Sequence, residues 1–121
     1  MDTLTIPAIT REVKRLARQE PDTVAKAEYV QYVGPSKTPT PACILGVALY
    51  NLGVPMNTLR TNNKESIKEV LSVLFEDELA WDVFTEEIEW LSAVQIYQDD
   101  ETNWRESIRL ANKAVKATAQ V

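Results

Sequence analysis

Apolar residues recur at helical spacing over five segments of the chain, and no segment shows the clean alternation of a half-buried strand. Spacings of three and four residues place the apolar side chains of each segment on one stripe. The pattern therefore predicts an all-α fold, a compact bundle of about five helices in a single helical domain over 1–121. The expected helices cover residues 8–19, 42–52, 63–75, 86–98 and 104–118.

The second of these helices is predicted to be the central one. Thr40 is a natural N-cap, and Pro41 suits the first helical position, where its missing N–H costs nothing. Gly53 suits the left-handed conformation that ends a helix, with Val54 supplying the accompanying apolar contact. The helix between them is apolar nearly all the way round, which is typical of a helix enclosed by others.

Local signals also set the other boundaries. Capping boxes are indicated at Asn62 with Glu65 and at Asn103 with Glu106, and Thr85 is expected to cap the fourth helix. Residues 56–61 are expected to form a short turn, and 27–33 one short strand or extended segment. The residues expected to face the core are Ile6, Ile9, Val13, Leu16, Ile67, Val70, Leu71, Leu74, Ile88, Leu91, Val94, Trp104, Ile108, Ala111 and Val115.

Composition narrows the classes of function. The 121 residues include no histidine, which excludes imidazole catalysis and histidine-ligated metals. Cys43 is the single cysteine, so no intrachain disulfide forms. No signal peptide and no apolar run of membrane-spanning length is found, and we expect a cytoplasmic protein with no membrane contact. We also expect no enzyme activity, no metal and no cofactor.

The charge is uneven along the chain. The formal net charge is −5, and residues 76–101 hold ten acids and no base. Aromatic residues beside acids are typical of protein-binding surfaces, where Trp and Tyr anchor and charges steer. The alternative is that Trp81 and Trp90 cover the edge of the core, and the acidic residues also leave open a cation or a basic partner. The predicted partner-contact residues are Tyr29, Tyr32, Trp81, Phe84, Trp90, Glu86 and Glu87.

The segment 42–62 also outlines a helix-turn-helix. In that interpretation Asn57, Thr58, Arg60 and Thr61 read base edges in the major groove. Few basic residues flank the segment, and an acidic protein is poorly suited to phosphate binding, so nucleic acid is not favoured as a partner. The structural alternative places four apolar side chains in the core at a sharp corner, namely Leu52, Val54, Met56 and Leu59.

Basic side chains form a coherent stripe on each of two helices. The stripe on the first helix contains Arg11, Lys14, Arg15 and Arg18, and that on the last contains Arg105, Arg109, Lys113 and Lys116. They are interpreted as a binding surface or, more simply, as solvated helix flanks that face the acids at 76–101.

Two strings of residues together resemble a known group. CILGVALYNLGVP at 43–55 resembles a Cys-aliphatic-aliphatic-Gly-x-Ala-Leu-x-x-Leu-Gly-Val core, and VQIYQD at 94–99, followed by Trp104, resembles a Gln-x-x-Gln-Asp…Trp pattern. The combination is similar to small uncharacterised proteins of actinobacteria and actinobacteriophages. The resemblance implies a shared helical fold and carries no catalytic residues.

The positions that carry the resemblance have a structural interpretation. Gln95 and Gln98 are expected to hydrogen-bond buried backbone groups where helices meet, with Trp104 packed over the junction. A phage context favours an accessory protein that binds a host protein. Self-association through a second copy of the chain remains a further alternative.

Overall fold

Every regular element in the described part of the chain is an α-helix. The computed structural model describes residues 4–23, 43–61, 66–75, 85–99 and 102–119. This confirms the all-α prediction, while the expected extended segment at 27–33 lies outside the described residues. The helices are α1 (Ile6–Gln19), α2 (Ile44–Asn51), α3 (Met56–Thr61), α4 (Ile67–Leu74), α6 (Thr85–Asp99) and α7 (Trp104–Ala119).

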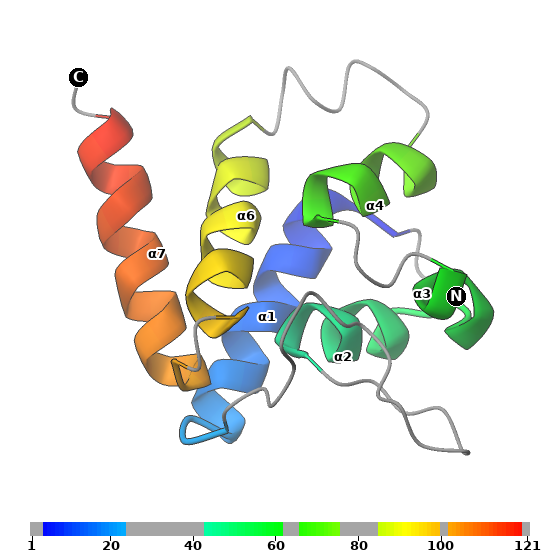
Figure 1. The fold of residues 1–121 in the computed structure, drawn as a ribbon, viewed down its shortest axis with the longest axis horizontal. Coiled ribbons are helices and arrows are strands. Elements are labelled where there is room, and N and C mark those ends of the chain that lie inside the picture. Colours follow the sequence, from blue (N-terminus) through cyan, green and yellow to red (C-terminus); the bar gives the residue numbers. More distant parts are fainter. Residues whose placement is uncertain (1–3, 24–42, 62–65, 76–84, 100–101, 120–121) are drawn as a thin grey trace.

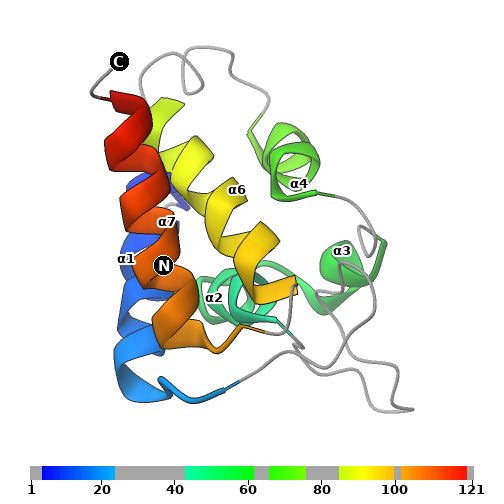
Figure 2. The ribbon, with the colours of Figure 1, turned by 60° about the vertical axis from the view of Figure 1, so that its left-hand side comes forward.

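Helix α6 holds the arrangement together. It runs antiparallel to α7, and this pair makes the most extensive helix–helix contact (Figure 1). It also packs against α1, α2 and α4, while α1 lies beside α7 as well (Figure 2). The small helix α3 packs against α2. A helix with neighbours on several sides must bury more than one stripe of residues.

The predicted stripes form the core. Most of the side chains expected there are buried, and three of them, Leu74, Ile108 and Val115, pack against the core while staying partly exposed. All four apolar residues of the α1 stripe are buried, which explains why the period of three and four residues located this helix so well.

The start of α2 differs from the prediction. The helix begins at Ile44, with Cys43 as an extended N-cap whose Sγ accepts a hydrogen bond from the Gly46 N–H at 3.2 Å. A helix that starts at Pro41 and continues through Cys43 is therefore wrong, while Thr40 and Pro41 themselves lie outside the described residues. The prediction of an enclosed helix is confirmed for the first six residues of α2, which are buried apart from half-buried Val47. The last two residues, Tyr50 and Asn51, are exposed.

The end of α2 follows the prediction. Gly53 has a φ of 100°, the left-handed region that glycine adopts without steric cost. Its N–H donates to the carbonyl of Tyr50, and the N–H of buried Val54 donates to the carbonyl of Leu49, both at 3.0 Å. These two bonds are those of a Schellman motif, which satisfies the last carbonyls of the helix.

Replacing Gly53 by alanine is expected to lower the free energy of unfolding by about 1–2 kcal/mol, because a Cβ disfavours positive φ. Urea denaturation followed by circular dichroism measures the change. Asparagine tolerates this conformation better, so Gly53→Asn is the matched control and should cost less than Gly53→Ala. Equal stability of the alanine variant and the wild type would contradict the assigned turn.

Two further boundaries correct the sequence prediction. Residues 56–61 form helix α3 and not merely a turn, since Leu59 is fully buried and holds this helix against the core. Helix α4 begins at Ile67, with Ser66 as N-cap accepting a hydrogen bond from the Glu69 N–H at 3.4 Å. The expected cap Asn62 lies outside the described residues, and a helix beginning directly after it is wrong.

The two glutamines of α6 explain where α2 and α4 begin. The Oε1 atom of Gln95 accepts a hydrogen bond from the Ile67 N–H at 2.7 Å, and Oε1 of Gln98 accepts one from the Ile44 N–H at 3.4 Å. Both side chains are buried. Each glutamine thus binds the first N–H of a helix, a donor that has no partner within its own helix. This confirms that the two glutamines bind buried backbone where helices meet.

The start of α7 is confirmed as predicted. Asn103 accepts a hydrogen bond from the Glu106 N–H through its Oδ1 at 2.8 Å. Residues just after α1 bind the same helix start, because the Trp104 N–H donates to the Thr23 carbonyl at 2.9 Å and the Arg105 N–H to the Pro21 carbonyl at 3.0 Å. The end of α1 and the beginning of α7 are therefore fixed side by side.

Candidate functional site

The predicted aromatic contact surface is only partly within the described residues. Tyr29, Tyr32, Trp81 and Phe84 lie outside them. Trp90 is described and is only 6% exposed, with its indole N–H donating to Oδ1 of Asn112 at 2.7 Å. Trp90 as a surface anchor is therefore wrong, because its side chain joins α6 to α7.

The acidic contact residues lie at the start of α6. Glu86 is exposed, Glu87 is half-buried, and both stand in the first turn, where the helix dipole favours acids. Glu89 forms an ion pair of 2.7 Å with Lys68 of α4. Among the described residues, no group of three or more His, Cys, Asp or Glu side chains could hold a metal ion.

The α2–α3 corner has the order of elements of a helix-turn-helix, although its second helix has only six residues. Asn57 and Thr61 are exposed on it, and Thr58 is half-buried. The side chain of Arg60 lies outside the described part. The apolar alternative is supported at this corner, since Val54 and Leu59 are buried, and Leu52 and Met56 pack against the core.

Lys14 and Arg18 of the α1 stripe and Arg105 of the α7 stripe line the same hollow, and we call the two stripes together the basic face. It consists of Arg11, Lys14, Arg15 and Arg18 of α1 with Arg105, Arg109 and Lys113 of α7, all of them exposed. The stripes come together because α1 and α7 lie side by side (Figure 2). The side chain of Lys116 lies outside the described part.

A hollow of about 500 Å³ is lined by residues of both α1 and α7 and by Pro21. Three cations line it, Lys14 and Arg18 from α1 and Arg105 from α7. Its apolar lining is Ala17, Pro21 and Ile108, and its remaining polar residue is Asn112. The hydrogen bond between Arg105 and the Pro21 carbonyl fixes one end of this hollow.

Lys14 is held at the hollow by an aromatic ring. Its Nζ lies 5.2 Å from the centroid of Trp90, a distance at which the face of the ring attracts a cation. Asn112 orients the same ring through the indole hydrogen bond. The buried tryptophan therefore positions Lys14 and Asn112 without reaching the surface as an anchor.

A second, larger hollow of about 810 Å³ lies on the other side of α1, next to the end of α2. Arg11, Arg15 and Arg18 line it, so Arg18 borders both hollows. Glu12 and Asn51 also line it, and the Asn51 side-chain amide donates to Glu12 Oε2 at 3.0 Å. Its apolar lining includes Leu4, Ala8 and Leu52.

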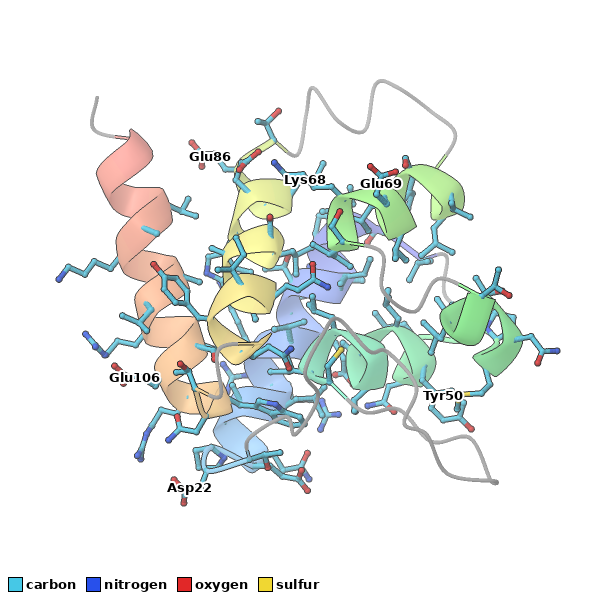
Figure 3. All side chains as sticks on the ribbon, in the orientation of Figure 1. Asp22, Tyr50, Lys68, Glu69, Glu86 and Glu106 are labelled. Carbon is cyan, nitrogen blue, oxygen red and sulfur yellow. The ribbon has the colours of Figure 1, made fainter. Side chains whose placement is uncertain are left out.

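Neighbouring acids neutralise part of the basic face. Arg15 binds Glu12 through two hydrogen bonds of 2.5 and 2.8 Å, which lower the pKa of Glu12 despite its desolvation. Arg109 donates from Nε and Nη2 to the single oxygen Oε1 of Glu106 and likewise lowers the pKa of that carboxyl group. Figure 3 labels Glu106 and Asp22, the acid that lies 3.6 Å from Arg105.

The described residues leave other cations of the basic face without an acidic partner. Within the described ranges, Arg11 and Arg18 have no ion-pair partner, and no acid of α6 pairs with the face. Glu86 and Glu69 lie at the opposite end of the bundle from Asp22 (Figure 3). The expectation that the stripes face the acids at 76–101 is therefore not met by the described residues of that segment.

The sequence located the two stripes but missed the hollow between them. Asn112, Pro21 and Ala17 were not expected to belong to a site. One signal was present, because Arg105, Ile108 and Asn112 follow each other at helical spacing and share one side of α7. Their pairing with α1 depends on how the helices pack.

Comparisons with known proteins give no relative for this chain. No family model matches it, and neither a curated protein nor a solved structure matches it. None of the helices in the described ranges is both long and apolar enough to cross a membrane.

Proposed function

We propose that the chain is a non-enzymatic accessory protein that acts by binding another protein through its basic face. The observation that carries the proposal is the hollow between α1 and α7, where Lys14, Arg18 and Arg105 surround apolar side chains. Protein interfaces commonly combine an apolar centre with a polar rim. The partner that fits such a surface is acidic.

Charge also favours this surface over the one expected from the sequence. On a chain with a net charge of −5, a cationic patch attracts an acidic partner to one side, because the more acidic remainder of the chain repels it. Arg18 borders both hollows, so a partner that crosses α1 meets its guanidinium group on either side. Arginine is also enriched among residues that dominate binding energy.

The resemblance to actinobacteriophage proteins suggests the source of the partner. We propose a host protein in the cytoplasm, with a second copy of the chain as the alternative. Tyr29, Tyr32, Trp81 and Phe84 remain predicted contact residues, and the exposed Glu86 with Glu87 remains a second predicted contact region.

A second candidate function is DNA binding through α2 and α3, supported by the exposure of Asn57 and Thr61. A recognition helix of six residues offers few side chains to base edges. This function predicts retention of duplex DNA that weakens steeply with salt and is lost in Arg60→Ala.

Reversing the charge of Arg18 is expected to weaken partner binding about tenfold or more, because attraction to an acidic partner becomes repulsion. The partner is first captured on the protein from lysates of the producing cell and of its host. Titration with the captured protein then gives the dissociation constant of each variant. Arg18→Glu is compared with the wild type, and circular dichroism checks that the fold is retained.

Lys68→Glu is the control, since Lys68 is a half-exposed cation on α4 that pairs with Glu89 and lines neither hollow. This variant should bind the partner within about twofold of the wild type. A partner that binds the wild type and Arg18→Glu equally would overturn the proposal. Retention of duplex DNA that depends on Arg60, without any protein partner, would favour the second function.

A further inference from the structure

We infer that the hollow between α1 and α7 takes an acidic protein segment in which one large apolar side chain stands between two carboxylates. The inference rests on the proposed function and specifies the sequence of the partner. The apolar side chain enters the hollow, and the carboxylates bind the cations around it.

The polar side chains of the described residues that line the hollow are three cations and one asparagine. Lys14, Arg18 and Arg105 are permanently donating cations, and no carboxylate of the described residues lines the hollow. The Oδ1 atom of Asn112 already accepts the bond from the Trp90 indole, so its amide N–H groups remain to donate outward. Four donors around one hollow match a ligand that offers acceptors, and carboxylates are the acceptors that pair with arginine in two-pronged bonds.

The apolar lining of the hollow is the reason for expecting a large apolar side chain in the ligand. Ala17 is 5% exposed, and Ile108 and Pro21 are half-buried, so apolar surface lies between the cations of α1 and Arg105 of α7. A volume of about 500 Å³ admits one large side chain with part of its main chain. Covering this surface removes it from water, which pairing with carboxylates alone does not do.

The exposure of the rim favours a protein segment over a small molecule. Lys14, Arg18, Arg105 and Asn112 are all exposed, whereas small-molecule sites enclose most of the ligand surface. Nucleic acid is less suitable, because its affinity rises with the number of phosphates contacted, and Glu12, Asp22 and Glu106 offset part of the positive charge. An acidic segment needs only the two or three cations at this hollow.

The test is to titrate the whole protein with synthetic peptides and to monitor binding by its backbone-amide and indole NMR signals. The probe is acetyl-Gly-Glu-Glu-Leu-Glu-Glu-Gly-amide. We expect saturable shifts at Ala17, Ile108 and the Trp90 indole N–H, with the indole signal assigned by Trp90→Phe. Replacing the peptide leucine by alanine should weaken binding about tenfold or more, and replacing its glutamates by lysine should abolish it. Arg105→Glu should weaken binding, and Lys68→Glu should leave it unchanged.

The outcomes separate this inference from the proposed function. Equal binding of the leucine and alanine peptides, or no peptide binding in a protein whose partner capture still depends on Arg18, overturns the apolar anchor and leaves the proposed function standing. Loss of both peptide binding and Arg18-dependent capture overturns both. Inorganic phosphate or duplex DNA that shifts the same signals more strongly than the peptide overturns the acidic protein segment as ligand.

Discussion

Replacing Leu91 by alanine is expected to lower the free energy of unfolding by about 2–5 kcal/mol, the largest single effect we predict. Leu91 is fully buried in the middle of α6. This helix packs against α1, α2, α4 and α7, so the lost side chain leaves a cavity in a core whose packed helices cannot easily close it. Urea denaturation followed by far-ultraviolet circular dichroism measures the change.

Ile96 offers a control on the same helix. Its side chain is 64% exposed, and Ile96→Ala should change the free energy of unfolding by about 0.5 kcal/mol or less. The two variants remove similar aliphatic groups from one helix and differ in burial. Similar losses for both would contradict the central place of α6 in the core.

The helix boundaries that were predicted well are set by residues near them in the sequence. Helix α1 has one apolar stripe and ends just before Pro21, both visible within twenty residues of sequence, whereas its start at Ile6 after the N-cap Thr5 precedes the expected residue 8. The end of α2 likewise follows from Gly53, because a left-handed residue is a property of the chain at that position. Such signals do not depend on which helices become neighbours.

The boundaries that were missed have distant causes. The first N–H groups of α2 and α4 bind Gln98 and Gln95, which lie 54 and 28 residues away along the chain. Local capping rules favoured Thr40 and Asn62 as the N-caps. A side chain that reaches the helix start from another helix leaves no signal in the sequence near that start. Only the interpretation of the two glutamines as partners of buried backbone pointed to this arrangement.

The place of Trp90 on α6 was misjudged for a related reason. One inward stripe was expected on this helix, and Trp90 fell outside it. Helix α7 covers that second side, so Trp90 is buried and hydrogen-bonded to Asn112. A helix that packs on several sides has no single apolar stripe, and periodicity alone cannot say which aromatic residue remains at the surface.

The candidate site likewise has one part that local sequence predicts and one part that depends on distant packing. Each basic stripe is a property of one helix and was found from spacing alone. Their meeting at one hollow requires α1 and α7 to be neighbours, although 84 residues separate Arg105 from Pro21, whose carbonyl its N–H binds. Long-range packing therefore turns two ordinary helix flanks into a candidate binding surface.

Replacing Gln95 by methionine is expected to lower the free energy of unfolding by about 1–3 kcal/mol. Methionine keeps a long side chain of similar size but offers no carboxamide oxygen, so the Ile67 N–H loses an acceptor at 2.7 Å in a buried place. The cost is that of a buried donor left unsatisfied, which exceeds the net gain of an ordinary hydrogen bond. Urea denaturation measures the change, and hydrogen exchange at α4 amides locates it.

Two other glutamines serve as comparisons. Gln98→Met should cost less than Gln95→Met, because the bond from Ile44 N–H to Gln98 is longer, at 3.4 Å. Gln19→Met at the exposed end of α1 should change stability by about 0.5 kcal/mol or less. Faster exchange confined to α4 in Gln95→Met would show that this side chain anchors the helix start. Unchanged exchange there, together with wild-type stability, would mean that Ser66 alone is enough to begin α4.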